Sequence, residues 1–269
     1  MPSPSLGPVR DKGEAESQRR TLMKIAVAGK GGVGKTTMTV WLGEHLSRQG
    51  KDVWLVDADT ALSLGPALGL SDSEVPTPLV QHKDLIQERV GTGGFINMNP
   101  QVDDLVTRLS KEVRGMHLLV MGTIAGAGGG CGCAPNALLK AMLAHLILRK
   151  SECVLVDLEA GVEHLGRGTI SSVDGLVIVS EPSIRGLRTA SQIGGLARDL
   201  RLTNQALVLN RCSETYTPPA DMDLPPVAAR VPYLESLAAQ QQETSSVLDL
   251  PDREVIDGLC ASTLERLGV

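Results

Sequence analysis

The chain has 269 residues, a formal net charge of −5 and 42% hydrophobic residues, which is typical of one large globular domain or two small ones. Aromatic residues make up only 2% of the sequence, which disfavours functions that stack bases or sugars on aromatic side chains. The acidic balance disfavours a protein that coats DNA or membranes, because both need a basic surface.

The first 22 residues are rich in proline, serine and charged residues and contain no apolar run. We therefore expect residues 1–22 to be a disordered leader and not a secretory signal, and residues 23–269 to form a single domain. No stretch reaches about 18 uninterrupted apolar residues, so no membrane span is expected. The five cysteines are an odd number without the spacing of a disulfide framework, which favours a cytoplasmic protein.

Short apolar runs alternate with helical patterns along the rest of the chain. Strands are predicted at Lys24–Ala28, Asp52–Val56, Glu152–Val156, Leu176–Ser180, Gln205–Leu209 and Ala228–Val231, with weaker candidates at Phe95–Met98 and His117–Met121. Helices are predicted at Thr36–Arg48, Asn136–Arg149, Ile184–Leu200 and Asp252–Leu267. The alternation predicts an α/β fold with a doubly wound, mostly parallel sheet, whose ligands bind where the strands end.

The segment GKGGVGKTT follows the first predicted strand and opens the first predicted helix. It matches the phosphate-loop pattern G-x-x-x-x-G-K-[ST], and through Gly29, Gly31 and Gly34 it also matches the dinucleotide pattern G-x-G-x-x-G. Lys35 and Thr36 favour the phosphate loop, which needs an ammonium for the β- and γ-phosphates and a hydroxyl for Mg²⁺. The alternatives are a dinucleotide oxidoreductase and a turn without a ligand. The predicted ATP-binding residues are Gly29, Lys30, Gly31, Gly32, Val33, Gly34, Lys35, Thr36 and Thr37.

A glycine-rich segment, Gly122–Ala134, carries two cysteines one residue apart. Six of its 13 residues are glycine, so ordering this segment costs conformational entropy. Cys131 and Cys133 are too close for a relaxed disulfide, but they can chelate a soft or borderline metal such as Ni²⁺ or Zn²⁺. Two thiolates fill half of a four-coordinate site, and the same pair from a second chain would complete it. The alternative is two incidental surface thiols.

The string KGGVGKTT resembles the deviant phosphate loop of the dimeric P-loop ATPases of the SIMIBI type, which include nitrogenase reductase, the MinD and ParA positioning proteins and the arsenite-pump ATPases. The resemblance implies that Lys30 reaches the nucleotide of the partner chain. A cation supplied in this way would stabilise the charge of the transition state, as an arginine finger does.

The resemblance also assigns roles to polar residues at predicted strand ends. It implies that Asp59 orients the attacking water. Asp57, two residues earlier on an extended chain, is expected to have a supporting role. Asp157 begins a D-x-x-x-G sequence that is similar to the second switch of the family, which implies that Asp157 lies near Mg²⁺ and that the Gly161 N–H lies near the γ-phosphate. Asn210 matches the position that bonds adenine, and a purely structural role for it is equally open.

The segment from the cysteine pair to the Glu-Pro pair resembles the CooC-type nickel-insertion ATPases of carbon monoxide dehydrogenase. The matching residues are Cys131, Cys133, Asn136, Asp157, Glu159–Gly161, Glu163–Leu165, Arg167–Thr169, Glu181 and Pro182. The resemblance implies a homodimer that uses ATP and Mg²⁺ to carry Ni²⁺ to the active-site cluster of the dehydrogenase, with no nucleic acid or membrane as partner. Thr60 departs from the family, which usually has proline there.

Two other functions and one residue stay open. A positioning or partition ATPase needs a basic surface, whereas the last predicted helix is acidic. An iron–sulfur electron donor like nitrogenase reductase uses two well-separated cysteines per chain and not an adjacent pair. His164 could be a transient metal ligand, or a structural histidine.

Overall fold

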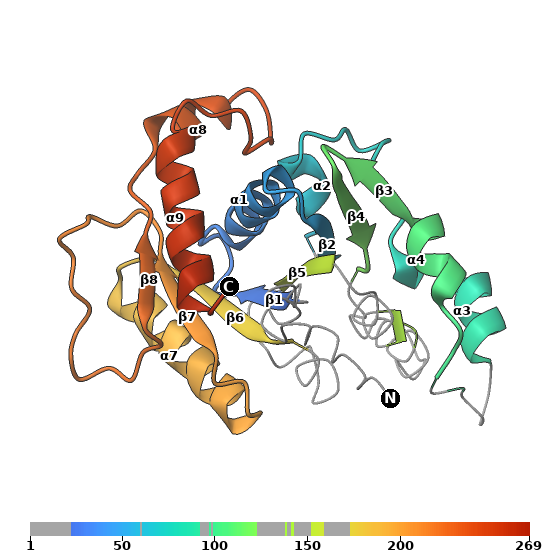
Figure 1. Ribbon diagram of the computed structural model, residues 1–269, viewed down its shortest axis with the longest axis horizontal. Helices are drawn as coiled ribbons and strands as arrows, with labels where there is room; N and C mark the ends of the chain where they lie inside the picture. Colours follow the sequence, from blue (N-terminus) through green and yellow to red (C-terminus); the bar gives the residue numbers. More distant parts are fainter. Residues whose placement is uncertain are drawn as a thin grey trace, which may run out of the picture.

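The computed structural model describes residues 23–59, 61–91, 97, 99–122, 138, 141–142, 152–158 and 173–269. These residues build an eight-stranded sheet with the order β3-β4-β2-β5-β1-β6-β7-β8 (Figure 1). The strands are β1 Met23–Ala28, β2 Asp52–Ala58, β3 Ser110–Val113, β4 Met116–Val120, β5 Glu152–Leu158, β6 Gly175–Ser180, β7 Gln205–Leu209 and β8 Val227–Arg230. Neighbouring strands are parallel except for the antiparallel pair β3–β4. The prediction of a doubly wound, mostly parallel α/β fold is confirmed.

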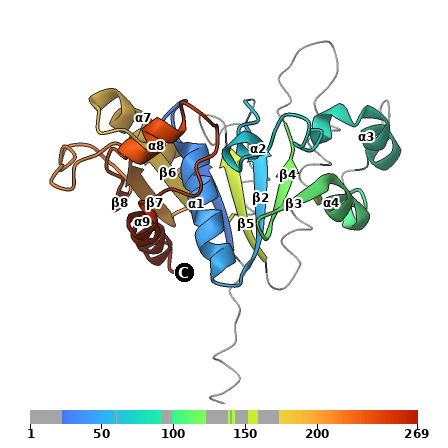
Figure 2. The same cartoon turned by 90° about the horizontal axis from the view of Figure 1, so that it is seen from above.

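Helices cover both faces of the sheet (Figures 1 and 2). On one face, α1 Lys35–Arg48, α2 Leu64–Ala67 and α9 Arg253–Arg266 share a core with one side of the strands. On the other face, α3 Lys83–Val90, α4 Asp103–Leu109 and α7 Ile184–Asp199 share a second core. Because both faces are covered, every residue of β1 and β6 is buried. The remaining short helices are η1 Leu79–Gln81 and α8 Glu235–Gln240.

The predicted strands and helices agree with the structure where the apolar pattern is strong. Strands β2 and β5 each extend two residues beyond the predicted end, so Asp57 and Asp157 lie inside strands and not after them. The two residues are register partners on these neighbouring strands. The apolar run ends before the aspartate in each case, so the apolar pattern predicts a strand that is too short.

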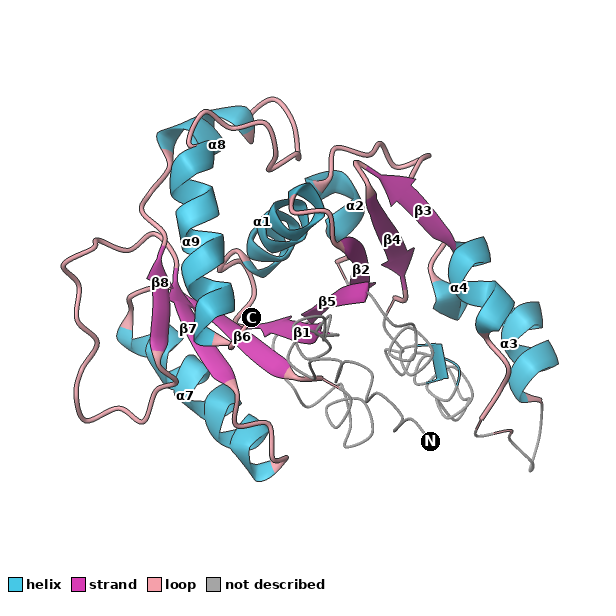
Figure 3. Ribbon diagram, in the orientation of Figure 1, coloured by secondary structure: helices cyan, strands magenta, loops and turns pink. Residues whose placement is uncertain are grey.

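The pattern missed short elements, which Figure 3 shows around the sheet. Strand β3, with the sequence SKEV, is a polar edge strand, and α2 has four residues that include glycine and proline. Helices α3, α4 and α8 have eight, seven and six residues. Of the predicted strand Phe95–Met98, only Asn97 is described, and it is not in a strand.

Two other predictions fall partly or wholly outside the described residues. Within the predicted helix Asn136–Arg149, the described residues are Leu138, Ala141 and Met142, and all of them are helical. The predicted leader, residues 1–22, lies outside. In the described part of the chain, no helix has the length and apolarity needed to cross a bilayer.

Candidate ATP-binding and hydrolysis site

The phosphate loop joins β1 to α1, and two of its glycines are required by their surroundings. Gly29 has a φ of 150°, and a Cβ there would lie 2.2 Å from the carbonyl oxygen of Val179 on β6. Gly34 has a φ of 99°, and a Cβ there would lie 2.5 Å from Nδ2 of Asn210. Neither position accepts a side chain, so the loop keeps its backbone close to the ends of β6 and β7.

The other side of the loop faces open space. A Cβ on Gly31 or Gly32 would meet no atom within 4 Å, and both residues are exposed. No side chain caps the N-terminus of α1 among the described residues, so its first N–H groups are available to an anion. Free N–H groups and the positive end of the helix dipole form a phosphate site here.

Lys35, the first residue of α1, carries the cation of this site. Its ammonium lies 3.6 Å from Oδ2 of Asp59, and only 6% of the residue is exposed. Asp59 Oδ1 accepts a hydrogen bond of 2.9 Å from the N–H of Ala61. The structure therefore brings together the predicted phosphate-binding lysine and the predicted water-orienting aspartate.

Asp157 and Thr36 form the candidate magnesium site. The Thr36 hydroxyl donates to Asp157 Oδ2 at 2.5 Å, while Asp157 Oδ1 is buried and has no hydrogen-bond partner among the described residues. Burial raises the pKa of Asp157 to about 7. A buried carboxylate oxygen without a partner, beside a hydroxyl, suits a hard cation that prefers oxygen ligands. These residues therefore fit Mg²⁺.

Asp57 binds the backbone of the segment between β2 and α2, which contains Asp59. Its carboxylate is fully buried and accepts hydrogen bonds from the N–H of Asp59 at 3.2 Å and the N–H of Leu64 at 2.9 Å. Burial raises its pKa to about 6. Both carboxylate oxygens accept hydrogen bonds from backbone N–H groups, which agrees with a supporting role and not with direct contact to a substrate.

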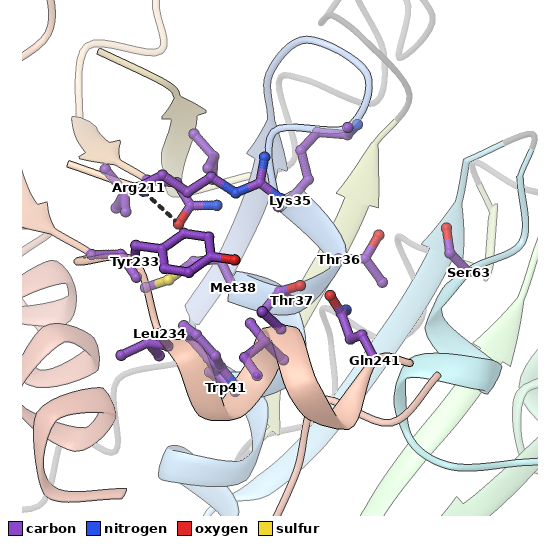
Figure 4. Close-up of a pocket in the computed structure, with 18 of the residues that line it drawn as sticks. Lys35, Thr36, Thr37, Met38, Trp41, Ser63, Arg211, Tyr233, Leu234 and Gln241 are labelled. Carbon is purple, nitrogen blue, oxygen red and sulfur yellow. Dashed lines mark hydrogen bonds between the residues drawn. The ribbon is translucent and has the colours of Figure 1, made fainter. Parts of the chain in front are cut away.

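A pocket of about 500 Å³ extends from the phosphate loop toward α8. Figure 4 shows Arg211 and Tyr233 on one side of it, Thr36 and Ser63 on the other, and Trp41 and Leu234 beside α8. Several residues that line the pocket carry no sequence motif: Trp41, Ser63, Arg211, Tyr233, Leu234 and Gln241. Arg211 and Tyr233 could have been predicted, because both follow predicted strands and ligands bind where the strands of such a sheet end.

The pocket wall on the β7 side is fixed by Asn210. Its Nδ2 donates to the carbonyl oxygen of Val33 at 2.7 Å, and its Oδ1 accepts from the N–H of Arg211 at 2.9 Å. Asn210 therefore has a structural role in joining β7 to the phosphate loop. It also lines the pocket, so its predicted contact with adenine stays a prediction. Arg211 has a φ of 51° and pairs with Glu181 at 2.8 Å.

The predicted nickel site and second switch lie outside the described residues. This applies to Cys131, Cys133, Gly161 and His164. Within the described ranges, no group of three or more histidine, cysteine or acidic side chains could hold a metal. The other cysteines, Cys153, Cys212 and Cys260, are free and buried, which is typical of cysteines that pack as small hydrophobic residues.

Comparison with known proteins places this site in a family. Residues 24–245 match the model of the CobQ/CobB/MinD/ParA nucleotide binding domain. The chain is also 40% identical, over 91% of its length and 98% of the relative, to the carbon monoxide dehydrogenase accessory protein CooC of Rhodospirillum rubrum. The chain belongs to the CooC branch of the CobQ/CobB/MinD/ParA family. It is therefore a P-loop ATPase. An uncharacterized ATP-binding protein of Methanocaldococcus jannaschii is 42% identical over 70% of this chain and 75% of the relative.

Solved structures show the same fold at low sequence identity. MinD in the MinC:MinD complex of Aquifex aeolicus superposes with a TM-score of 0.66 at 20% identity, covering 90% of this chain and 96% of that one. A ParA family ATPase of Chlorobium tepidum gives a TM-score of 0.64 at 18% identity, covering 90% and 98%.

Proposed function

We propose that this ATPase is a metallochaperone that inserts nickel into the active-site cluster of carbon monoxide dehydrogenase. The observation that carries the proposal is the similarity to CooC, which is named as an accessory protein of that enzyme. The match covers 98% of the length of CooC. The cysteine pair Cys131 and Cys133 supports it, because adjacent thiolates suit a borderline metal that must be carried and released.

The chain's own residues supply the steps of ATP hydrolysis. The loop N–H groups and Lys35 bind the β- and γ-phosphates. Thr36 and Asp157 would hold Mg²⁺, which would add positive charge at these phosphates. Asp59 orients the attacking water. Lys30 is exposed and makes no ion pair with any described residue, so its ammonium is available to the nucleotide of a partner chain.

Nickel is the cargo and would bind between two chains. Cys131 and Cys133 of each protomer would form a site of four thiolates, which neither chain completes alone. Closure of the dimer around ATP would then change the geometry of the cysteine loop. A four-thiolate site binds Ni²⁺ and Zn²⁺ alike, so release depends on conformational change and not on weak affinity.

Transfer of nickel to a nickel-deficient carbon monoxide dehydrogenase tests the proposal. The purified chain, loaded with Ni²⁺, should activate the enzyme with Mg-ATP but not with a non-hydrolysable ATP analogue. The Cys131→Ser/Cys133→Ser variant, which keeps the ATP site, should hydrolyse ATP without activating the enzyme. Equal activation by free Ni²⁺ and by the loaded chain would contradict a role in nickel delivery.

A further inference from the structure

Trp41 lies where the nucleotide pocket meets the C-terminal part of the chain. Its side chain lines the pocket beside Leu234, and only 3% of the residue is exposed (Figure 4). The indole N–H donates a buried hydrogen bond of 2.8 Å to the carbonyl oxygen of Val247. A side chain at the pocket wall thereby holds a backbone group that is 206 residues away in sequence.

Val247 continues this connection to helix α2. Its N–H donates to the carbonyl oxygen of Ala67, the last residue of α2, at 3.0 Å. Gln240, the last residue of α8, donates to the carbonyl oxygens of Ser246 and Leu248 at 2.9 and 2.8 Å. We call residues 246–248 the strap. The strap therefore has attachments to α1, to α2 and to α8.

The opposite end of α2 is attached to the residues that hold Asp59. Leu64, the first residue of α2, donates its N–H to Oδ2 of Asp57, and Oδ1 of the same carboxylate accepts the N–H of Asp59. A helix of four residues has little stability of its own, so its position depends on its attachments. One end of α2 is hydrogen-bonded to the strap, and the other end is hydrogen-bonded to the Asp57 carboxylate, which also binds the N–H of Asp59.

We infer that Trp41 is a positioning residue for ATP hydrolysis, which acts on Asp59 through the strap and α2. The ring of Trp41 lines the pocket and its N–H fixes the strap, so one side chain contacts both. The inference rests on the role of Asp59 in orienting water that is proposed above. It adds a link between occupation of the pocket and placement of the hydrolytic groups.

The Trp41→Phe variant tests the inference, because phenylalanine keeps an aromatic ring against the pocket and removes the five-membered part of the indole that carries the N–H donor. The expected result is a fall in kcat of roughly 10-fold, since misplacing a catalytic group by about 1 Å costs up to ~10²-fold. The KM for ATP should change less than twofold. A side chain with a merely structural role would lower the melting temperature and leave kcat per folded molecule unchanged.

Trp54 provides the matched control. It is 2% exposed, it packs in the core on the other face of the sheet, and its ring stacks on His117 at 4.5 Å. Its Nε1 has no hydrogen-bond partner among the residues that the structure describes. Trp54→Phe makes the same chemical change away from the strap and should leave kcat unchanged. It also leaves Trp41 as the single tryptophan, whose fluorescence should change when ATP binds.

A second variant keeps the test independent of Trp41. Gln240→Leu removes both hydrogen bonds from α8 to the strap, so it should also lower kcat at nearly constant KM. The double variant should lose less than the product of the single losses, because both act through one element. Normal kcat in both single variants, or a raised KM with normal kcat in Trp41→Phe, would overturn the inference. Absence of ATP binding by isothermal titration in the unmodified chain would instead contradict the proposed function.

Discussion

The ammonium of Lys35, at the start of α1, lies 3.6 Å from the carboxylate of Asp59. Lys35 is the predicted phosphate-binding residue, and Asp59 is the residue proposed to orient the attacking water. A γ-phosphate binding to Lys35 competes with Asp59 for the same ammonium. We therefore expect binding of ATP to weaken this ion pair and free the Asp59 carboxylate for a water molecule.

Lys35→Ala should weaken ATP binding by roughly 10²-fold, the equivalent of about 3 kcal/mol for hydrogen bonds to a charged group. The physical reason is that the β- and γ-phosphates lose their cation within the chain. Isothermal titration measures the effect, with Lys51→Ala, an exposed lysine beyond the end of α1, as the control. Near-normal affinity in Lys35→Ala would remove the phosphate-loop assignment.

Asp59→Asn should bind ATP and dimerise, yet hydrolyse it roughly 10²–10⁴-fold more slowly, the range ascribed to a positioned general base. The amide is similar in size but does not accept the proton of the attacking water. Phosphate release and light scattering measure the two properties on one sample. Normal turnover would transfer the role to Asp57 or Asp157.

Lys30→Ala should leave ATP binding to the monomer unchanged, while ATP-driven dimerisation and hydrolysis are lost. The exposed side chain of Lys30 makes no ion pair with a described residue of its own chain, so its charge is expected to act on the partner's nucleotide. Analytical ultracentrifugation with ATP and the Asp59→Asn variant as reference separates dimerisation from turnover. Turnover within a few-fold of the unmodified chain would argue against action across the dimer.

Asp257 on α9 joins helix α1 through His45 at 2.9 Å and through Arg48. The Arg48 guanidinium lowers the pKa of Asp257 to about 2, so its contribution to stability is present above the ordinary pKa of an aspartate and is lost as the pH falls through 2. Asp257→Asn should lower the unfolding free energy at pH 7 by about 1 kcal/mol, and the difference should vanish below about pH 2.

The control for this prediction is Asp249→Asn, which removes the partner of Arg114 at a more exposed position, with 67% of the Asp249 side chain accessible. Screening by water makes such a pair weaker. Urea unfolding at several pH values compares the two variants. A loss in Asp257→Asn that does not depend on pH would contradict the assigned ion pair.

The sequence predicted the features that depend on local pattern. The positions of the strong strands follow from apolar runs, and the phosphate loop follows from a spacing with a chemical reason. The ends of β2 and β5 were missed because Asp57 and Asp157 are charged residues buried in central strands. Burial of a charge depends on the site around it, which a single sequence does not display.

The connections between distant parts of the chain were not predictable. The hydrogen bond from Trp41 to Val247 joins an apolar helix residue to a backbone carbonyl, and neither has a sequence signature. The same is true of Val247 and Ala67, whose hydrogen bond links the backbones of a loop and a four-residue helix. Such contacts result from packing of the whole domain, so they required the structure.

The measurement that tests the proposed nickel-carrier function most directly is the number of nickel ions bound per chain, together with mass in solution. Elemental analysis and light scattering should give one Ni²⁺ per dimer, bound more weakly as pH falls and the Cys131 and Cys133 thiolates become protonated. The Cys131→Ser and Cys133→Ser variants should lose the metal and metal-linked dimers while they keep ATP binding. One nickel per monomer, or a double cysteine variant that still dimerises with nickel, would contradict a site shared between two chains.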